Sequence, residues 1–219
     1  MEGTARSEAI EHSGKAVPVQ RRARRTRAAL LAAVGKIVAA QGAEAVTTTA
    51  VAQATGVSVG TIYRYFDDRD ALLLATYDGS VAGIVETCAR ALHGFPADLP
   101  REEAALKLLS LYLATADADP AHAGLLKAMR AIRPIASDQT GGNEADISRD
   151  LIAPFLARFA PKASVDPGGL HFLNVLLGTL VDLFLVTPPG PERERIRRDV
   201  EAHMMLALSR AVGRDKFDP

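Results

Sequence analysis

Helical spacing of apolar residues along nearly the whole chain is the feature that most restricts its fold. Leucine, valine, isoleucine and alanine recur every three or four positions, which is the period of an amphipathic α-helix. No segment joins strict alternation of apolar and polar residues to flanking turn residues, as a half-buried strand would. The sequence therefore predicts an all-α protein of about nine helices.

Prolines, glycines and capping residues set the boundaries of the expected helices. Thr47, Ser58 and Asp68 stand where a side-chain oxygen can cap a helix start, and Gly42 and Gly56 stand where a helix can end. The expected helices cover residues 22–41, 47–56, 58–66, 69–92, 101–117, 120–133, 143–160, 167–186 and 192–212. Residues 1–20 are charged and lack an apolar run, so we expect a disordered tail there and no signal peptide.

Composition excludes several classes of protein. The chain is 48% apolar and 24% charged, which is typical of a globular protein with a sizeable core. Its one cysteine, Cys88, excludes a disulfide framework and Cys-rich metal sites, and favours the reducing cytoplasm. The most apolar run, residues 172–186, is shorter than the roughly 20 residues that cross a bilayer and contains Asn174 and Asp182, so no membrane partner is expected.

Positive charge is concentrated near the N-terminus, although the formal net charge of the chain is zero. Residues 15–65 contain eight Lys or Arg and one acid, Glu44, whereas residues 66–219 contain 17 basic and 22 acidic residues. This distribution indicates a basic module that meets a polyanion, joined to a mildly acidic body with another role.

Residues 47–66, TTTAVAQATGVSVGTIYRYF, read as two short helices joined by a tight turn. A helix-turn-helix needs a small residue for close packing, a glycine in the turn and a branched apolar residue in the second helix. Ala52, Gly56 and Ile62 stand at those positions. The alternative is an ordinary packing hairpin, which does not account for the basic surroundings.

The second helix of this pair separates its residues into two faces at about 100° per residue. The inner face is apolar and consists of Ile62 and Phe66. The outer face holds small and hydrogen-bonding residues, Gly60, Thr61 and Arg64, which suits a helix that enters the major groove. Tyr63 and Tyr65 flank it, and either their phenols reach phosphates or their rings cover the edge of the core.

The segment VTTTAVAQATGVSVGTIYRYFDDRDALLLA and the basic helix before it resemble the signature of the TetR family of bacterial transcriptional regulators, over about residues 22–77. The resemblance implies a DNA-binding domain, residues 21–68, and a helical domain for effector binding and dimerisation, residues 69–219. The DNA contacts that it implies are Thr47, Thr49, Ser58, Gly60, Thr61, Tyr63, Arg64, Tyr65 and Arg69. Val59 and Arg69 depart from the family pattern, in which a polar residue and a lysine are more usual. Arg69 keeps the charge but presents a planar fork.

An arginine-rich tract, residues 21–27, precedes this segment. One interpretation is an arm that reaches an adjacent minor groove, where A·T tracts concentrate negative potential. The other is the start of a helix that contacts phosphates without reading sequence. Both interpretations make Arg27 a DNA contact.

Beyond residue 92 the resemblance fades, and the candidate effector site rests on individual residues. The candidates are side chains on the expected body helices: Leu92, Tyr112, Met129, Phe155, Phe159, His171 and Asn174. Few charges interrupt this set, which favours a lipophilic or aromatic small-molecule effector, and plain core packing is the alternative for each residue. No histidine pair has i, i+4 spacing, so neither a metal nor another cofactor is expected.

The last two expected helices carry more apolar residues than one core-facing stripe needs. The expected dimer interface comprises Leu173, Leu177, Leu180, Phe184, Met205 and Leu208. The alternative is a deeply buried central helix in a monomer.

The sequence as a whole predicts a cytoplasmic homodimer that binds double-stranded DNA. We expect a repressor that a mostly apolar effector releases from a palindromic operator. The HExxH, GxGxxG and P-loop motifs are missing, and no enzyme is expected. The alternative is a helical adaptor that binds protein, with an enzyme ranked below it.

Overall fold

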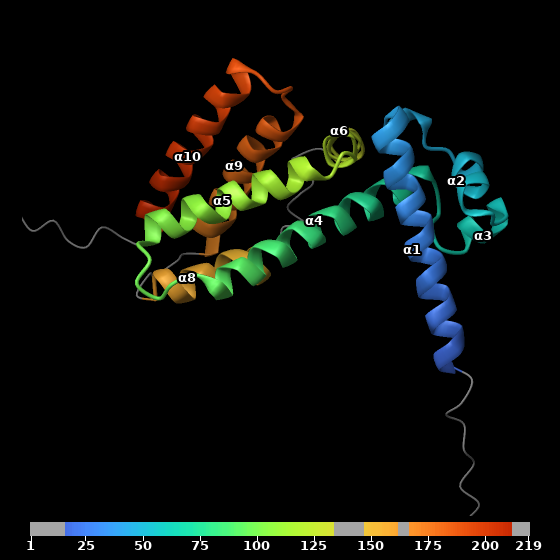
Figure 1. The fold of residues 1–219 in the computed structure, drawn as a ribbon, viewed down its shortest axis with the longest axis horizontal. Coiled ribbons are helices and arrows are strands. Elements are labelled where there is room, and N and C mark those ends of the chain that lie inside the picture. Colours follow the sequence, from blue (N-terminus) through green and yellow to red (C-terminus); the bar gives the residue numbers. More distant parts are fainter. Residues whose placement is uncertain (1–15, 134–146, 162–166, 212–219) are drawn as a thin grey trace, which may run out of the picture.

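The computed structural model describes residues 16–133, 147–161 and 167–211, and it contains helices and no strands in those ranges (Figure 1). Side chains are described for residues 20–133, 147–161 and 175–210. The molecule is elongated. Three helices form one end, the long helix α4 leads away from them, and the remaining helices form a body beside the rest of α4 (Figure 1). The predicted all-α fold is confirmed.

The N-terminal unit consists of α1 (Ala16–Gln41), the 3-10 turn η1 (Ala43–Ala45), α2 (Thr48–Thr55), α3 (Val59–Tyr63) and the first turns of α4 (Arg69–Gly94). Its core is built from apolar side chains that are almost fully buried: Leu30, Val34, Val38, Val46, Val51, Ile62, Phe66, Leu72 and Leu73. Ala121 and Leu125, from a helix of the body, complete the same core. The hydrophobic core of the N-terminal unit is therefore incomplete without these two residues of the body.

Side-chain caps start three of these helices where the sequence predicts them. Thr47, Ser58 and Asp68 each accept a hydrogen bond from the backbone N–H three residues later, at 3.0, 3.2 and 2.7 Å. Gly56 ends α2 with a φ of 70°, in the left-handed region that a side chain makes costly. Local chemistry thus fixes the turn between α2 and α3.

Helix α1 begins earlier than predicted, at Ala16 instead of residue 22. Residues 16–20 are therefore helical and do not belong to a disordered tail, while residues 1–15 lie outside the described ranges. Alanine, arginine and glutamine have high helix propensity, and Pro18 stands in the first turn, where its missing N–H costs no intrahelical bond. An uncharged stretch, AVPVQ, thus extends the arginine-rich helix toward the N-terminus.

The body contains α5 (Arg101–Ala118), α6 (His122–Ile132), α8 (Ala153–Phe159), α9 (Pro167–Val186) and α10 (Pro191–Ala211). A π-helical turn, Ser148–Ile152, precedes α8, and the Ala153 N–H donates to Ser148 O across it. Pro154 follows at once and has no N–H, which accounts for a widened turn at this point. The predicted helix 143–160 is therefore a π turn followed by a short α-helix, and residues 143–146 lie outside the described ranges.

Helices α9 and α10 pack against each other, α4, α5 and α6 pack among themselves, and α5 and α6 also contact this pair. Buried apolar side chains of these helices form one core, which includes Ile84, Leu108, Leu126, Phe184 and Val200. Within the described ranges no helix is both long enough and apolar enough to cross a membrane.

Candidate functional site

Helix α3 has a polar outer face and an apolar inner face, as its sequence predicts. Ile62 is fully buried and Phe66 is 6% exposed, so both anchor α3 in the N-terminal core. Gly60 and Arg64 are exposed, and Arg64 directly follows the last residue of the helix. A small exposed face of this kind, held by buried anchors, fits a DNA major groove.

The two tyrosines beside this face differ in burial. Tyr63 is 55% exposed, so its phenol is available to a ligand. Tyr65 is partly buried and packs against the N-terminal core. The structure favours the phosphate-contact interpretation for Tyr63 and the core-edge interpretation for Tyr65.

Hydroxyl groups gather where α2 and α3 begin. Thr47 and Ser58 use oxygen lone pairs as helix caps, which leaves the hydroxyl proton of Thr47 for another acceptor. Ser58 Oγ and Thr61 Oγ1 are 2.9 Å apart, so one of these hydroxyls donates to the other. Thr49 is exposed in the first turn of α2. Hydroxyl and backbone donors at helix starts are suited to phosphate oxygens.

Residues 56–60, GVSVG, also match the GxSxG pattern of a hydrolase nucleophile elbow. That elbow requires a strand before the serine and a helix after it. Here Ser58 lies between two helices, and its Oγ is engaged with Thr61. The match is therefore a coincidence of the helix-turn-helix sequence.

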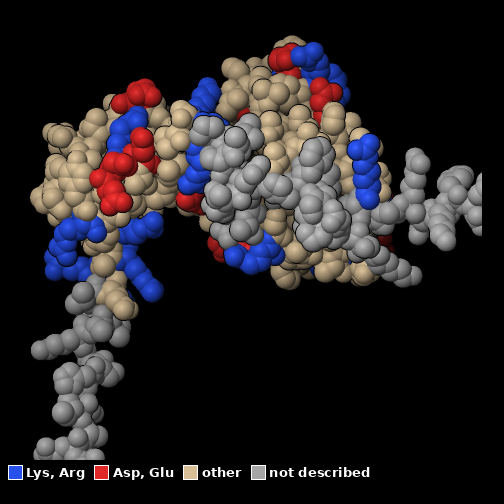
Figure 2. Space-filling view, turned by 180° about the vertical axis from the view of Figure 1, so that it is seen from behind, with Lys and Arg blue, Asp and Glu red and all other residues tan. Residues whose placement is uncertain are grey.

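The arginines of α1 lie on a helix that continues past α2 and α3 (Figure 1). Their side chains are exposed, and Figure 2 shows Lys and Arg gathered around this part of α1: Arg21, Arg22, Arg24, Arg25 and Arg27. The Arg27 guanidinium lies 5.3 Å from the centre of the Phe66 ring, which places residues 21–27 beside the end of the helix-turn-helix segment, residues 47–66. A helix about 10 Å wide does not enter a minor groove about 6 Å wide, so the phosphate-contact interpretation fits residues 21–27.

Arg69, an expected DNA contact, is instead engaged within the protein. Its Nε donates to Val46 O and its Nη2 to Ala43 O, both at 2.8 Å. Its guanidinium also lies 3.3–3.4 Å from the carboxylates of Asp70 and Glu44. The planar fork of arginine thus joins the start of α4 to the segment before α2, which a lysine could not do with the same geometry.

Helix α6 connects the body to the N-terminal unit through a very close contact with α1. A Cβ placed on Gly124 of α6 would lie 2.7 Å from Val38 Cγ1, so only glycine fits there without a shift. Val38 is 5% exposed. Beside this contact is an open hollow of about 400 Å³ between α1, α4 and the start of α6, whose lining includes Lys36, Ser80 and Asp119.

A buried polar link ties α6 to α4 at the same junction. Ser80 Oγ donates to Asp119 Oδ2 at 2.7 Å and lies 2.9 Å from His122 Nδ1. Since the only hydroxyl proton of Ser80 goes to Asp119, Nδ1 is the donor in the second bond. Burial lowers the pKa of His122, against the charges of Asp119 and Asp117, which favours the neutral imidazole.

A second polar cluster lies inside the body. Arg130 of α6 and Asp182 of α9 form an ion pair in which Nε and Nη2 lie 2.7 and 2.6 Å from Oδ2, and both side chains are mostly buried. Burial raises the pKa of Tyr77 and Tyr112, and the negative charge of Asp182 raises both further. Tyr77 is not among the site residues that the sequence predicts, but its ring packs against the core of the body and lies 5.8 Å from the His122 ring, centroid to centroid.

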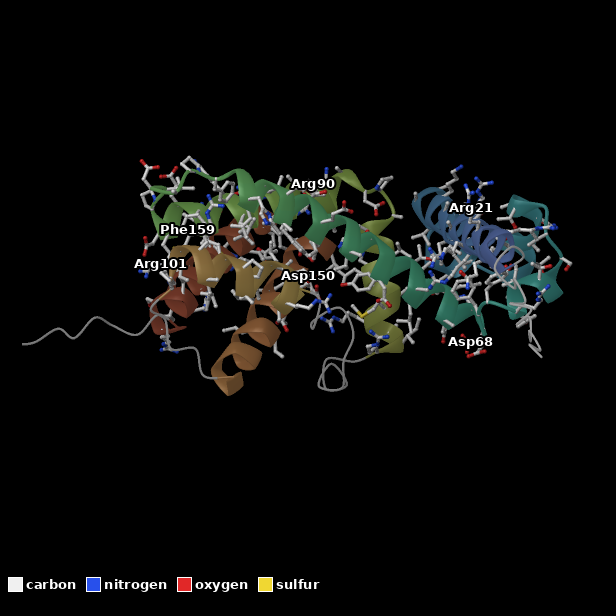
Figure 3. All side chains as sticks on the ribbon, turned by 90° about the horizontal axis from the view of Figure 1, so that it is seen from below. Arg21, Asp68, Arg90, Arg101, Asp150 and Phe159 are labelled. Atoms are coloured by element: carbon white, nitrogen blue, oxygen red, sulfur yellow. The ribbon has the colours of Figure 1, made fainter. Side chains whose placement is uncertain are left out.

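Of the expected effector residues, Leu92, Met129 and Phe155 belong to the core of the body, and Tyr112 and Phe159 pack against the same core. Leu92, Phe155 and Phe159 lie together at the end of the body away from α1, where the Phe155 and Phe159 rings are 5.2 Å apart (Figure 3, Phe159 labelled). Leu92, Met129 and Phe155 are buried, which agrees with the alternative that they are ordinary core residues. Tyr112 lies near Asp182 of the polar cluster. The side chains of His171 and Asn174 lie outside the described ranges.

The expected dimer residues also divide into two groups. Phe184 and Leu208 are 5% and 8% exposed and belong to the core of their own chain, so they do not form an outer face here. Leu177, Leu180 and Met205 are partly exposed, and the side chain of Leu173 lies outside the described ranges. Among the described side chains of α9 and α10, Leu183 and Leu206 are the exposed large apolar ones, at 49% and 46%.

Comparison with known proteins supports the DNA-binding interpretation of the N-terminal unit. Residues 30–76 match the family model described as bacterial regulatory proteins, tetR family. A search of curated protein sequences finds no significant match. Proteins of the matched family are DNA-binding regulators and not enzymes, in agreement with the sequence analysis.

Solved structures share the fold at low sequence identity. The TetR-family repressor AlkX from Dietzia sp. strain DQ12-45-1b, implicated in biodegradation of n-alkanes, is 18% identical, with a TM-score of 0.60 over 85% of this chain and 97% of that one. A TetR regulator from Rhodococcus sp. RHA1 is 20% identical, with a TM-score of 0.59 over 87% and 97%. The multidrug binding protein EbrR, solved with imidazole, is 22% identical, with a TM-score of 0.54 over 81% and 93%.

The bonds of Arg69 predict a structural role that can be separated from DNA binding. Arg69→Gln should lower the free energy of unfolding of the N-terminal unit by about 1–3 kcal/mol, because hydrogen bonds from a charged donor are lost. The slope of log Kd for DNA against log salt concentration should stay unchanged. Denaturant unfolding and DNA titrations measure both quantities, with Arg90→Gln as control, since Arg90 is exposed and 3.8 Å from Glu86. A slope that falls by about one unit would mean that Arg69 contacts a phosphate instead.

Proposed function

Since this chain carries the DNA-binding module of the bacterial TetR-family regulators on the fold that such regulators share, we propose that it is a ligand-responsive repressor. In this proposal a homodimer binds a palindromic operator in the cytoplasm, and a small, mostly apolar effector releases it. The observation that carries the proposal is the exposed face of α3, held on buried Ile62 and Phe66 beside the arginines of α1.

Each part of the DNA-binding unit has a separate role in the proposal. Gly60, Thr61 and Arg64 enter the major groove, and Arg64 reads a base edge. Tyr63, Thr47, Thr49 and Ser58 contact phosphates on either side of the groove. The arginines of α1 lie along neighbouring phosphates and raise the affinity for any duplex, because each phosphate contact releases counterions.

We place the division between the two domains near residue 68, with one qualification. Residues 69–219 hold the effector site and the dimer interface in the proposal. Ala121 and Leu125 of α6 nevertheless belong to the N-terminal core. A body helix is thus part of the DNA-binding unit, and a change in the body reaches the unit directly.

Dimerisation is proposed through α9 and α10. The partly exposed residues Leu177, Leu180 and Met205 support it, together with the more exposed Leu183 and Leu206. Pairing these two helices with their copies in a second subunit would cover the exposed apolar side chains. A two-fold arrangement then presents two α3 helices to successive major grooves, about 34–36 Å apart or slightly more.

The release of DNA is proposed to pass through α6. This helix carries Arg130 of the inner polar cluster and, about 9 Å nearer its start, Gly124 against Val38 of α1. A ligand that moves α6 therefore moves the N-terminal unit. Its effect on DNA binding is limited to its differential affinity for the two arrangements, typically about 1–3 kcal/mol.

Substitutions on α3 test the DNA-binding role. On an operator selected from a random duplex pool, Arg64→Ala should cost about 1–3 kcal/mol and relax the preference at one base position in each half-site. On scrambled duplex it should cost much less. Tyr63→Phe removes only a hydroxyl that contacts a phosphate, so it should weaken both duplexes by similar factors. Titrations on both duplexes decide the outcome. If Tyr63→Phe changes the sequence preference and Arg64→Ala does not, the assignment of the faces of α3 is wrong.

The contact at Gly124 tests the route through α6. In Gly124→Ala the new methyl overlaps Val38, so the N-terminal unit must shift, and operator affinity should fall about tenfold. Affinity for a short duplex with a single half-site should change less, because only the relative placement of the two units is altered. Removing the opposing methyls in a Gly124→Ala/Val38→Ala double variant should restore operator binding.

A matched control for this experiment is Gly83→Ala. Gly83 is exposed on α4, and a Cβ there has no atom within 4 Å. This variant should bind the operator like the unmodified protein. Equal operator affinity for Gly124→Ala and Gly83→Ala would refute the proposed route.

A further inference from the structure

The hollow between α1, α4 and the start of α6 is bounded by both units of the molecule. These three helices pack against one another (Figure 1). The wall on α1 belongs to the N-terminal unit, whereas the wall at the start of α6 belongs to the body. The volume of about 400 Å³ falls within the range of roughly 300–1,000 Å³ that is typical of small-molecule sites. A ligand held there would contact the two units at once.

Apolar and small residues form most of the wall of this hollow. Leu31 of α1 and Leu125 of α6 supply the large apolar side chains. Gly35 of α1 and Gly79 of α4 also line the hollow, and a Cβ placed on either would have no atom within 4 Å. The apolar part of a ligand can therefore approach the backbone of α1 and α4 closely.

The carboxylate of Asp119 is held in a fixed orientation in the lining. Ser80 Oγ donates to its Oδ2 at 2.7 Å, and the Ala121 N–H donates to its Oδ1 at 2.9 Å. His122 Nδ1 holds Ser80 in turn, at 2.9 Å. These donors are neutral, and within the described ranges Asp119 forms no ion pair. No cation of the protein therefore neutralises this carboxylate, and its oxygens retain lone pairs for a further donor.

Lys36 of α1 brings the opposite charge to the lining. Its side chain is exposed and forms neither an ion pair nor a hydrogen bond with any other described residue. Lys36 and Asp119 are the two charged residues of the lining, and they do not pair with each other. The hollow thus offers one positive and one negative group to a ligand.

The two charges decide which ligands suit the hollow. A ligand with a single charge is attracted by one of these groups and repelled by the other, whereas a ligand with both charges can satisfy both. We propose that the hollow binds a small zwitterion, with its ammonium group on Asp119, its carboxylate on Lys36 and its apolar body against the apolar wall. Free apolar amino acids have this chemistry. The site is separate from the effector site proposed in the body, so the inference goes beyond the proposed function.

Three compounds with the same branched apolar group test the need for both charges. L-Leucine carries both, 4-methylpentanoate lacks the ammonium group, and 3-methylbutylamine lacks the carboxylate. Each is equilibrated with the full chain by dialysis, without DNA, and the bound compound is measured by chromatography. L-Leucine should bind about tenfold more tightly than either of the others, because each lacks one hydrogen bond to a charged group. Equal or tighter binding of a singly charged compound would overturn the inference, as would no binding of L-leucine at millimolar concentration.

Substitutions of the two charged residues assign each charge to its partner. In Lys36→Gln the affinity for L-leucine should fall about tenfold, while 3-methylbutylamine should bind no more weakly than before, because it has no carboxylate to lose a contact. In Asp119→Asn the affinity for L-leucine should fall likewise, while 4-methylpentanoate should bind no more weakly. A substitution that merely disturbs the fold would weaken all three compounds alike, and that result would contradict the inference.

Matched controls use the same substitutions away from the hollow. Lys127 of α6 and Asp98, before α5, are exposed and do not line the hollow. Lys127→Gln and Asp98→Asn should bind L-leucine like the unmodified protein, and circular dichroism confirms that each variant is folded. An equal loss in Lys127→Gln and Lys36→Gln would mean a general effect of charge and would refute the site. Since no DNA is present, the outcome does not depend on the proposed function.

Discussion

The contact between Val38 of α1 and Gly124 of α6 is the constraint on which the arrangement of the two halves depends. The contact is so close that a Cβ at position 124 does not fit against Val38 Cγ1 without a shift. Ala121 and Leu125, close to Gly124 in sequence, belong to the N-terminal core, so residues of the body form part of the core of the DNA-binding unit. The unit is held at this junction by packing and not by α4 alone, and the hydrogen bonds among Ser80, Asp119 and His122 fix α6 against α4 beside it.

Charge and rigidity act together at the other end of the molecule. The eight basic residues between positions 15 and 65 stand against one acid, so a chain of zero net charge presents a strongly positive surface to DNA. The helical form of residues 21–27 keeps five of these charges on a rigid element beside Phe66. Such an element strengthens binding to any duplex, while the exposed face of α3 is left to distinguish one sequence from another.

Local signals made the DNA-binding unit predictable from sequence. The caps at Thr47, Ser58 and Asp68 and the turn at Gly56 act over three or four residues, so their chemistry can be read directly. The role of Arg69 could not be read, because its acceptors at Ala43 and Val46 lie 26 and 23 residues away. The start of α1 was not predicted, because residues 16–20 contain Pro18 and two valines, which are weak helix formers, and no capping residue marks the start.

The ligand site was less predictable for a physical reason. Apolar side chains give the same sequence signal whether they line a cavity or fill a core, and Leu92, Met129 and Phe155 fill the core. The polar pair Arg130 and Asp182 is 52 residues apart, and only the packing of α6 on α9 brings it together.

The most direct test of the account is the distance between the two DNA-binding units of the dimer. Cys88 is first replaced in a Cys88→Ala variant, so that a spin label attaches only to the cysteine of Gln53→Cys, which is exposed on α2. Pulsed electron paramagnetic resonance then measures the distance between the labels of the two subunits. The account predicts one distance for the unmodified dimer, a shifted distance in Gly124→Ala, and its recovery when Val38→Ala is added. An unshifted distance in Gly124→Ala, or no coupling between labels at all, would contradict it.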